Sequence, residues 1–155
     1  MKKRYLSLIC IIAFVLSISG VSVRAQGVTS MVDGSYLIHE VESEGSALLD
    51  TRGVYLQAGT SKINKPAAGV INAGGTTTAS RTVDEIGIAV VVERLKKGTS
   101  SWYYYRSWEL VKEDASSVMS SKRLTVSGGY YYRVRSTHWA NSEASSSLTD
   151  GIYVN

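Results

Sequence analysis

The segment VDEIGIAVVVERL, residues 83–95, constrains the fold of this chain more than any other stretch. From Ile86 to Val92 every even-numbered position is large and apolar, and the positions between them are Gly, Ala, Val and Glu. A period of two residues is typical of a strand with one buried face. A helix here would have to accept Gly87 and a β-branched run, which lowers its propensity. We therefore predict a core strand that buries Ile86, Ile88, Val90 and Val92.

The residues that follow predict a hairpin partner for this strand. KKGTSS, residues 96–101, is a turn, and WYYYRSWELV, residues 102–111, returns as a second strand. The loop is too long for the tightest turn types. Apolar and aromatic residues at even positions share one face of the second strand, but Arg106 interrupts them. A β-bulge in the middle of the strand would resolve this conflict.

The rest of the body, residues 52–155, consists of short apolar runs separated by Gly, Ser, Thr and Asn. RGVYLQAG, GVINAGG, KRLTVSGG and SSLTDGIYV each have the composition of a strand with a flanking turn. About seven short strands predict an all-β domain, an antiparallel β-sandwich. The stretch DASSVMSSK, residues 114–122, has two interpretations, a loop or a single helical turn.

The segment GYYYRVRS, residues 129–136, predicts one further strand. Tyr130, Tyr132 and Val134 lie on one of its faces, and Tyr131 and two arginines lie on the other. Because burying an arginine is costly, the first face is expected to point into the core. Leu124, six residues before Tyr130, is assigned to the core as well. Tyr131 is then left on the surface.

This region also resembles a known motif. The stretch LTVSGGYYYRV, residues 124–134, is similar to the tyrosine corner of immunoglobulin-like and fibronectin type III sandwiches. The preceding hairpin, VVVERLKKGTSSWYYYRSWEL, resembles the central C and C′ hairpin of the same sandwiches. The resemblance implies a sandwich of that type, in which a tyrosine hydroxyl bonds back to the preceding turn.

A second resemblance covers most of residues 52–154. RGVYLQAGTSKINK, VDEIGIAVVVERL, GYYYRVRSTHWA and TDGIYV are similar to segments of small secreted proteins of clostridial Gram-positive bacteria, a family with a domain of unknown function. This resemblance implies a signal peptide and a compact β domain. Because the function of that family is uncharacterised, it implies no catalytic or binding residues.

The first 25 residues have the layout of a secretory signal peptide. Lys2, Lys3 and Arg4 precede an apolar run from Leu6 to about Val23, and we expect cleavage after Ala25 and secretion. An uncleaved membrane anchor is the alternative. It is less favoured because serines and a glycine dilute the second half of the run, which is close to the minimum length for a span.

Removal of this leader changes the charge balance. The chain has 17 basic and 13 acidic residues, and four of the basic residues lie within residues 1–25. The remaining chain is neutral, which removes the electrostatic support for nucleic-acid binding. Cys10, the one cysteine, is lost as well. Residues 26–51 contain five acidic and no basic residues, so we predict a flexible acidic arm or pro-segment ahead of a sandwich at 52–155.

Few residues could support catalysis. Beyond the leader the chain has His39, His138 and no thiol, and no serine lies in a G-x-S-x-G motif. A hydrolase would need His138 and a loop carboxylate brought together by the fold. The adjacent carboxylates at 84–85 and 113–114 would point to opposite faces of a strand. We therefore predict no enzymatic activity, with a hydrolase as the least favoured alternative.

The sequence also contains no motif for a metal or a cofactor. It has no Cys or His cluster, no EF-hand loop, no P-loop and no dinucleotide fingerprint. The sequence leaves open calcium binding by isolated oxygen ligands in loops. We predict no cofactor and no resident metal.

Aromatic surface is the remaining candidate for function. We predict a binding patch of Tyr103, Tyr105, Tyr131, Arg133 and Trp139, because exposed aromatic rings stack on sugars and protein partners. The alternative is that these rings only form cross-strand pairs. The sequence thus favours a secreted interaction module that binds a cell-wall polysaccharide, a surface glycan or a protein. A secreted antibacterial or signalling effector with a removable acidic pro-segment is the alternative. Tyrosine-bearing edge strands would also permit a dimer.

Overall fold

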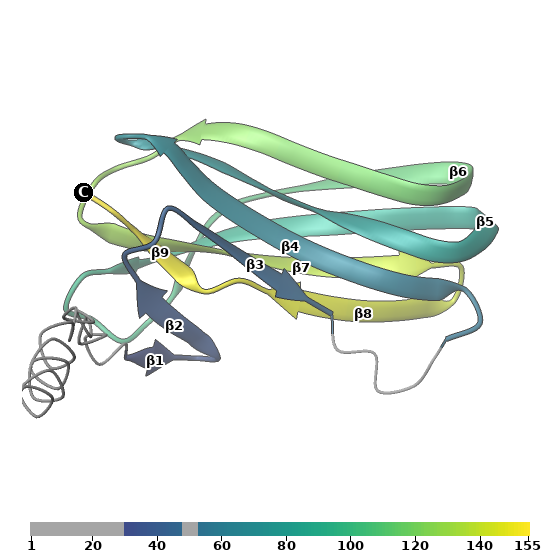
Figure 1. Cartoon of the computed structure of the whole chain (residues 1–155), viewed down its shortest axis with the longest axis horizontal. Coiled ribbons are helices and arrows are strands. Elements are labelled where there is room, and N and C mark those ends of the chain that lie inside the picture. Colours follow the sequence, from purple (N-terminus) through teal and green to yellow (C-terminus); the bar gives the residue numbers. More distant parts are fainter. Residues whose placement is uncertain (1–29, 48–52) are drawn as a thin grey trace, which may run out of the picture.

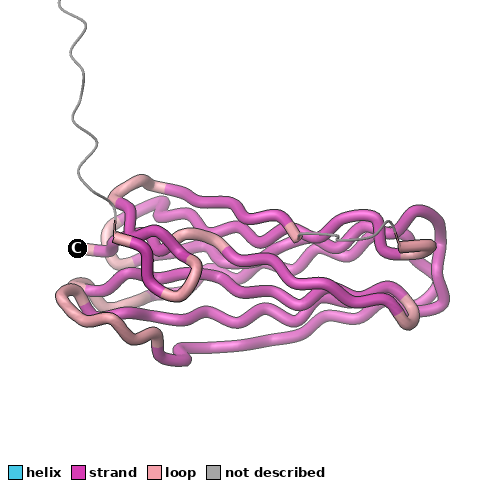
Figure 2. The backbone as a smooth tube through the Cα atoms, turned by 90° about the horizontal axis from the view of Figure 1, so that it is seen from below, coloured by secondary structure: helices cyan, strands magenta, loops and turns pink. Residues whose placement is uncertain are grey.

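The computed structural model describes residues 30–47 and 53–155, and these residues form β-strands joined by turns and loops (Figure 1). The described residues include no helix, which confirms the all-β prediction (Figure 2). The predicted signal peptide, its cleavage after Ala25 and Cys10 lie outside the described residues.

Residues 30–47 and 53–155 form nine strands where about seven were predicted, and these strands differ widely in length. They are β1 (Met31–Val32), β2 (Ser35–Ile38), β3 (Glu42–Ser46), β4 (Leu56–Ala67), β5 (Val70–Lys96), β6 (Tyr103–Thr125), β7 (Tyr130–Ala140), β8 (Glu143–Leu148) and β9 (Gly151–Val154). β5 and β6 together form the longest pair and organise the rest of the structure.

The β5–β6 ribbon folds back on itself. The Thr77 hydroxyl donates to the Gly87 carbonyl at 3.0 Å, although ten residues of straight strand would span about 33 Å. The pairing register between β5 and β6 shifts between Thr78 and Val83, and Asp114 on β6 has a φ of 49° at the same level. Both strands turn back at the same end of the molecule (Figure 1).

This bend divides the sheet into two layers that face each other. Layer A contains β3, β4, residues 70–78 of β5 and residues 117–125 of β6. Layer B contains residues 83–96 of β5, residues 103–113 of β6, and then β7, β8, β9, β2 and β1. Since all nine strands belong to one hydrogen-bonded sheet, the topology does not establish an immunoglobulin or fibronectin type III-like sandwich, which stays a prediction.

The sheet is mixed, whereas the sequence predicted antiparallel pairing throughout. β2 runs parallel to β9, with Leu37 opposite Gly151 and Ile38 opposite Ile152. Parallel neighbours need a long connection, and these two strands come from opposite ends of the chain. The difference therefore arises from a contact that no local pattern in the sequence specifies.

The core lies between the two layers and contains the predicted residues. Seven of the eight are buried: Ile86, Ile88, Val90, Val92, Leu124, Tyr132 and Val134. Tyr130 is half-buried and packs against this core at its end. Burial of such side chains contributes on the order of 2 kcal/mol each, so this set holds much of the fold together.

The predicted hairpin and its bulge are both present. β5 pairs with β6 over residues 86–94, and the register shifts by one residue beside Tyr105, where Arg106 breaks the aromatic pattern. The stretch 114–122 is neither a loop nor a helical turn, because it continues β6 and places Val118 in the core. The Val118 side chain is buried because layer B covers this face of layer A.

The acidic segment before residue 52 is not a flexible arm over the residues described. Residues 30–47 form β1, β2 and β3, and β3 pairs with β4 over five residue pairs. The Asp150 amide donates to the Ser43 hydroxyl at 2.9 Å, which ties β3 to the junction of β8 and β9. The N-terminal strands therefore close the side of the molecule opposite β6.

Candidate functional site

The predicted aromatic patch does not form one surface. Tyr103 is 63% exposed, but Tyr131 is 7% exposed and Arg133 is fully buried. Tyr105 is half-buried, with its ring against that of Tyr132 at 5.6 Å. Trp139 lies opposite Gly87 of β5. Tyr103 lies opposite Arg94, which is seven residues further along the same strand. The five residues therefore occupy separate places.

Arg133 was predicted on the surface, and it is instead the centre of a buried ionic cluster. Its Nε donates to Glu93 at 2.7 Å, and its Nη2 donates to the Asp33 carboxylate at 2.6 Å. Its Nη1 donates to the Asp33 carbonyl at 2.7 Å and to the Ser35 hydroxyl at 3.1 Å. The prediction failed because burying a guanidinium is costly only when it lacks partners, and Asp33 supplies one from 100 residues away.

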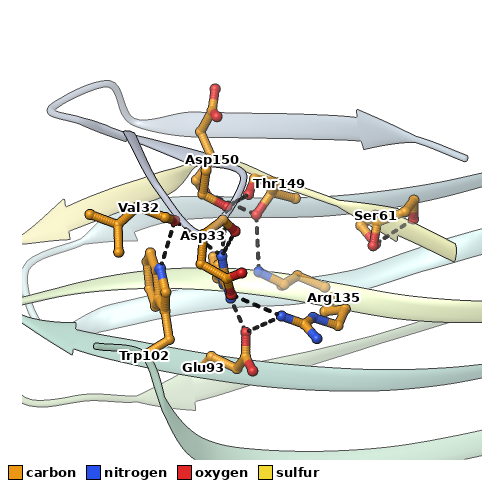
Figure 3. Close-up of polar contacts among 12 residues, drawn as sticks. Val32, Asp33, Ser61, Glu93, Trp102, Arg135, Thr149 and Asp150 are labelled. Carbon is orange, nitrogen blue, oxygen red and sulfur yellow. Dashed lines mark hydrogen bonds and ion pairs between the residues drawn. The ribbon is translucent and has the colours of Figure 1, made fainter. Parts of the chain in front are cut away.

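Trp102 completes this cluster. The Arg133 guanidinium lies 4.2 Å from the centre of the Trp102 ring, and Trp102 Nε1 donates to the Val32 carbonyl at 3.0 Å. Figure 3 shows Asp33, Glu93 and Arg135 converging beside this indole. The hydrogen bond and charge of Arg133 hold the pKa of Asp33 below its usual value of 3.8. The cluster thus fastens the β1–β2 turn over the outer face of β7.

Tyr131 is covered by the same N-terminal segment. Its ring lies 5.1 Å from that of Tyr153 and 6.0 Å from that of His39, measured between centroids. The Tyr131 hydroxyl and His39 Nε2 are 3.4 Å apart. A residue predicted as exposed is therefore a packing residue beneath the chain that leaves β2.

Trp139 lies flat on layer B. A Cβ at Gly87 would overlap the Trp139 ring, so the glycine makes room for the indole. Trp139 Nε1 donates to Glu85 Oε1 at 2.7 Å. The half-buried ring is therefore fixed against the sheet by its own contacts.

The tyrosine contact implied by the immunoglobulin-like resemblance is present. The Tyr132 hydroxyl donates to the Ser127 carbonyl at 2.9 Å, five residues upstream. Burial raises the pKa of Tyr132 above its usual value of 10.0, which keeps the hydroxyl protonated as a donor. This contact anchors the start of β7 to the preceding turn.

His138 belongs to a buried, neutral hydrogen-bond network. Its Nδ1 lies 2.8 Å from the Thr77 hydroxyl, and its Nε2 lies 2.7 Å from the Ser147 hydroxyl. Ser147 contacts Ser61 at 2.6 Å, and Ser61 donates to Ser136 at 2.7 Å. Burial lowers the pKa of His138 to about 4, so the ring is neutral at pH 7.

This network offers no route to the predicted hydrolase alternative. Its side-chain partners for His138 are hydroxyls of Thr77 and Ser147, and all three residues are at most 4% exposed. A serine nucleophile must reach a substrate, and its histidine is normally oriented by a carboxylate. These hydrogen bonds instead connect β4 and β5 of layer A to β7 and β8 of layer B.

The end of the β5–β6 hairpin, residues 94–106, carries exposed rings and cations, and we call it the tip. Tyr103 and Tyr104 are 63% and 65% exposed. The Arg94 guanidinium lies 5.0 Å from the Tyr130 ring centre and 5.5 Å from that of Tyr105. The tip sequence has four basic residues and no acidic one. None of the described salt bridges involves Arg94, Lys96 or Lys97.

A second feature is an open, polar groove on the outer face of layer A, with a volume of about 360 Å³. We call this the groove. It crosses four strands and is lined by Glu44, Thr60, Lys62, Asn64, Asn72, Gly74, Gly75, Thr76, Met119 and Ser121. At its floor, a Cβ on Gly74 would collide with the Ser120 carbonyl oxygen of β6, so the position requires glycine.

The long free edge of β6 is protected against strand addition. Among the described residues β6 pairs only with β5, and it carries Tyr103, Tyr104, Leu110, Val111 and Met119 as exposed large side chains. Arg106 and Lys112 lie opposite the buried Val92 and Ile86, which places cations on the inward side of this edge. Inward charges and a bulge are typical of edges that resist pairing.

The sequence interpretation missed both the tip cations and the groove. KKGTSS was assigned only as a turn, although four cations within residues 94–106 without an acidic neighbour are a visible signal. The groove depends on the pairing of Asn64 with Asn72 across the β4–β5 turn. The register shifts between Asn64 and Ala67, so counting residues from the turn does not predict this pair.

The described residues contain no group of three His, Cys, Asp or Glu side chains that could hold a metal ion. The same part of the chain has no helix with the length and apolar character of a membrane span.

Comparisons with known proteins give no relative. No family model, no curated protein and no solved structure matches this chain. The resemblance to small secreted clostridial proteins therefore stays a prediction. The surfaces described above must carry any functional conclusion.

Proposed function

We propose that the protein is a secreted, non-enzymatic interaction module that binds an acidic polysaccharide of a cell wall or cell surface through the tip. Tyr103 and Tyr104, exposed on opposite faces of β6 beside cations that take part in none of the described salt bridges, carry this proposal. Tyrosine rings stack on sugar rings, and lysine or arginine attracts carboxylate or phosphate groups along a polymer.

The nearest acidic residue in the strand supports this interpretation. Glu93 directly precedes the tip, but its carboxylate is 17% exposed and is held by Arg133 and Arg135. It is therefore not available to neutralise Arg94, Lys96 or Lys97. The N-terminal segment thus contacts Trp102 of the hairpin and the Arg133 cluster, whereas Lys96, Lys97, Tyr103 and Tyr104 are exposed.

An effector released from an acidic pro-segment has weaker support. Residues 30–47 contribute three strands, and Asp33 is an ionic partner of the buried Arg133. Cleavage near residue 50 would leave these strands paired with the body or expose Arg133 without its partner. A pro-segment that is removed easily would make fewer contacts of this kind.

Binding of purified protein to polygalacturonate, measured by calorimetry at two salt concentrations, tests the proposal. Tyr103→Ala with Tyr104→Ala should weaken binding about tenfold, since aromatic anchors carry much of a contact surface's energy. Lys96→Gln with Lys97→Gln should weaken it and reduce the salt dependence. Lys112→Gln, on the same hairpin but away from the tip, is the matched control. Equal loss in the control, or equal binding of methyl-esterified polymer, would contradict the proposal.

A further inference from the structure

The groove on layer A has a chemical character different from that of the tip. Its lining combines hydroxyls, amides, one thioether, Lys62 and Glu44, and it includes no aromatic side chain. A volume of about 360 Å³ lies within the range of small-molecule sites. Each of the four strands contributes a polar side chain, so a ligand with several polar groups fits this lining.

The charges in the groove are balanced. Lys62 Nζ lies 3.7 Å from Glu44 Oε2 and 3.6 Å from Glu42 Oε2. A lysine beside two carboxylates gives no net attraction for a phosphate or a nucleic acid. The groove therefore selects against strongly anionic ligands, which the tip attracts.

The two asparagines at the end of the groove nearest the β4–β5 turn are oriented by each other. Asn72 Nδ2 donates to Asn64 Oδ1 at 2.9 Å, from neighbouring strands. This bond uses one donor of Asn72 and the carbonyl of Asn64, so the Asn72 carbonyl and the Asn64 amino group are directed elsewhere. A fixed acceptor and a fixed donor side by side match two adjacent hydroxyl groups.

Hydroxyls and an apolar contact lie further along the groove, beyond the pair of Lys62 with Gly74. Thr60 and Thr76 stand opposite each other on β4 and β5, and Thr76 also stands opposite Met119 on β6. Met119 is 70% exposed, so its thioether and methyl group are open to a ligand. Alternating donors, acceptors and one soft apolar contact are suited to the mixed C–H and O–H surface of a sugar.

From this arrangement we infer that the groove is a binding site for a neutral, hydroxyl-rich ligand, a saccharide without acidic groups. This site does not depend on the tip, because the two share no residue and the groove lacks the excess of cations found at the tip. A protein with both sites contacts a mixed polysaccharide at its acidic and its neutral units.

Amide chemical shifts of the purified protein, followed by NMR during titration with cellohexaose or chitohexaose, test the inference. We expect shifts confined to groove residues, and about tenfold weaker binding in Asn72→Leu, since a lost polar contact is worth about 1–2 kcal/mol. Thr76→Val, which keeps the shape and removes a hydroxyl, should weaken binding less. Gln57→Leu, an exposed amide on β4 outside the groove, is the matched control.

The outcomes separate this inference from the proposed function. Neutral binding that is lost in Asn72→Leu and kept in Lys96→Gln with Lys97→Gln supports the groove. Absence of shifts with both oligosaccharides, or shifts confined to the tip, overturns it. If polygalacturonate binding persists in Asn72→Leu while neutral binding never occurs, the groove inference fails and the tip proposal stands.

Discussion

The molecule buries two polar clusters of opposite kinds, one around Arg133 and one around His138. The Arg133 cluster is ionic and joins the N-terminal segment to β7, with Asp33 still 67% exposed at its rim. The His138 cluster is neutral, lies between the layers, and consists of the ring, hydroxyl groups and backbone carbonyls. Charge is thus buried where solvent remains close, and neutral hydrogen bonds are used where it does not.

This difference predicts how the removal of a residue from each cluster affects stability. Loss of a charged partner leaves another charge without compensation, whereas loss of a neutral partner leaves an unsatisfied hydroxyl or a cavity. The first should act mainly on the attachment of β1 and β2. The second should act on the contact between layers A and B.

The largest effect is expected from Arg133→Met. Glu93 and Asp33 lose their shared partner, and the free energy of unfolding should fall by about 3 kcal/mol. Urea denaturation measures this loss, and hydrogen exchange should show faster exchange at Leu37 than in the core of β5. Arg135→Met is the control, because Arg135 is 47% exposed and its removal should cost under about 1 kcal/mol. Equal losses in both variants would mean that burial of Arg133 is irrelevant to stability.

The next effect, which reaches its full size only in acid, is expected from the titration of His138. Its pKa is about 4 in the folded protein and 6.5 when exposed, so the unfolded chain binds more protons between these values. Stability is therefore full above pH 6.5 and falls toward pH 4, by about 3 kcal/mol at most. His138→Gln should remove this pH dependence. Unchanged slopes of stability against pH in the variant would contradict the neutral network.

The smallest effect is expected from Asp33→Asn, and in a different pH range. The pKa of Asp33 is lowered by Arg133, so its contribution is present above pH 3.8 and is lost as the pH falls through the lowered value. The variant should differ from the native protein at neutral pH and converge with it in strong acid. Thermal denaturation of the native protein and the variant at pH 7 and at pH 2 measures the two differences in stability. Equal stabilities of the two proteins already near pH 5 would mean that the effect does not come from the ionised Asp33 carboxylate.

The strands that follow from local alternation could be predicted from the sequence. The even positions from Ile86 to Val92 are buried because a period of two residues specifies one face whatever the rest of the chain does. The interruption at Arg106 located the bulge for the same reason. Tyr130 and Tyr132 were separated correctly from the arginine face of β7.

The N-terminal strands and the candidate sites could not be predicted in the same way. β2 has four residues and is held by β9 and by the Arg133 cluster, which are contacts over more than 90 residues. The bend of β5 within TTTASRTV, residues 76–83, falls in polar sequence that fits a turn or a strand equally well. The aromatic patch failed because Arg133 and Tyr131 are covered by that same distant segment.

The pairing of β2 with β9 imposes an order on folding. Residues 37–38 have no strand to join until residues 151–152 have left the ribosome. Contacts this distant in the chain slow folding, because the intervening loop must close first. The β2–β9 pair therefore closes after local pairs such as that of β3 with β4, whose partners lie about 20 residues apart in the chain.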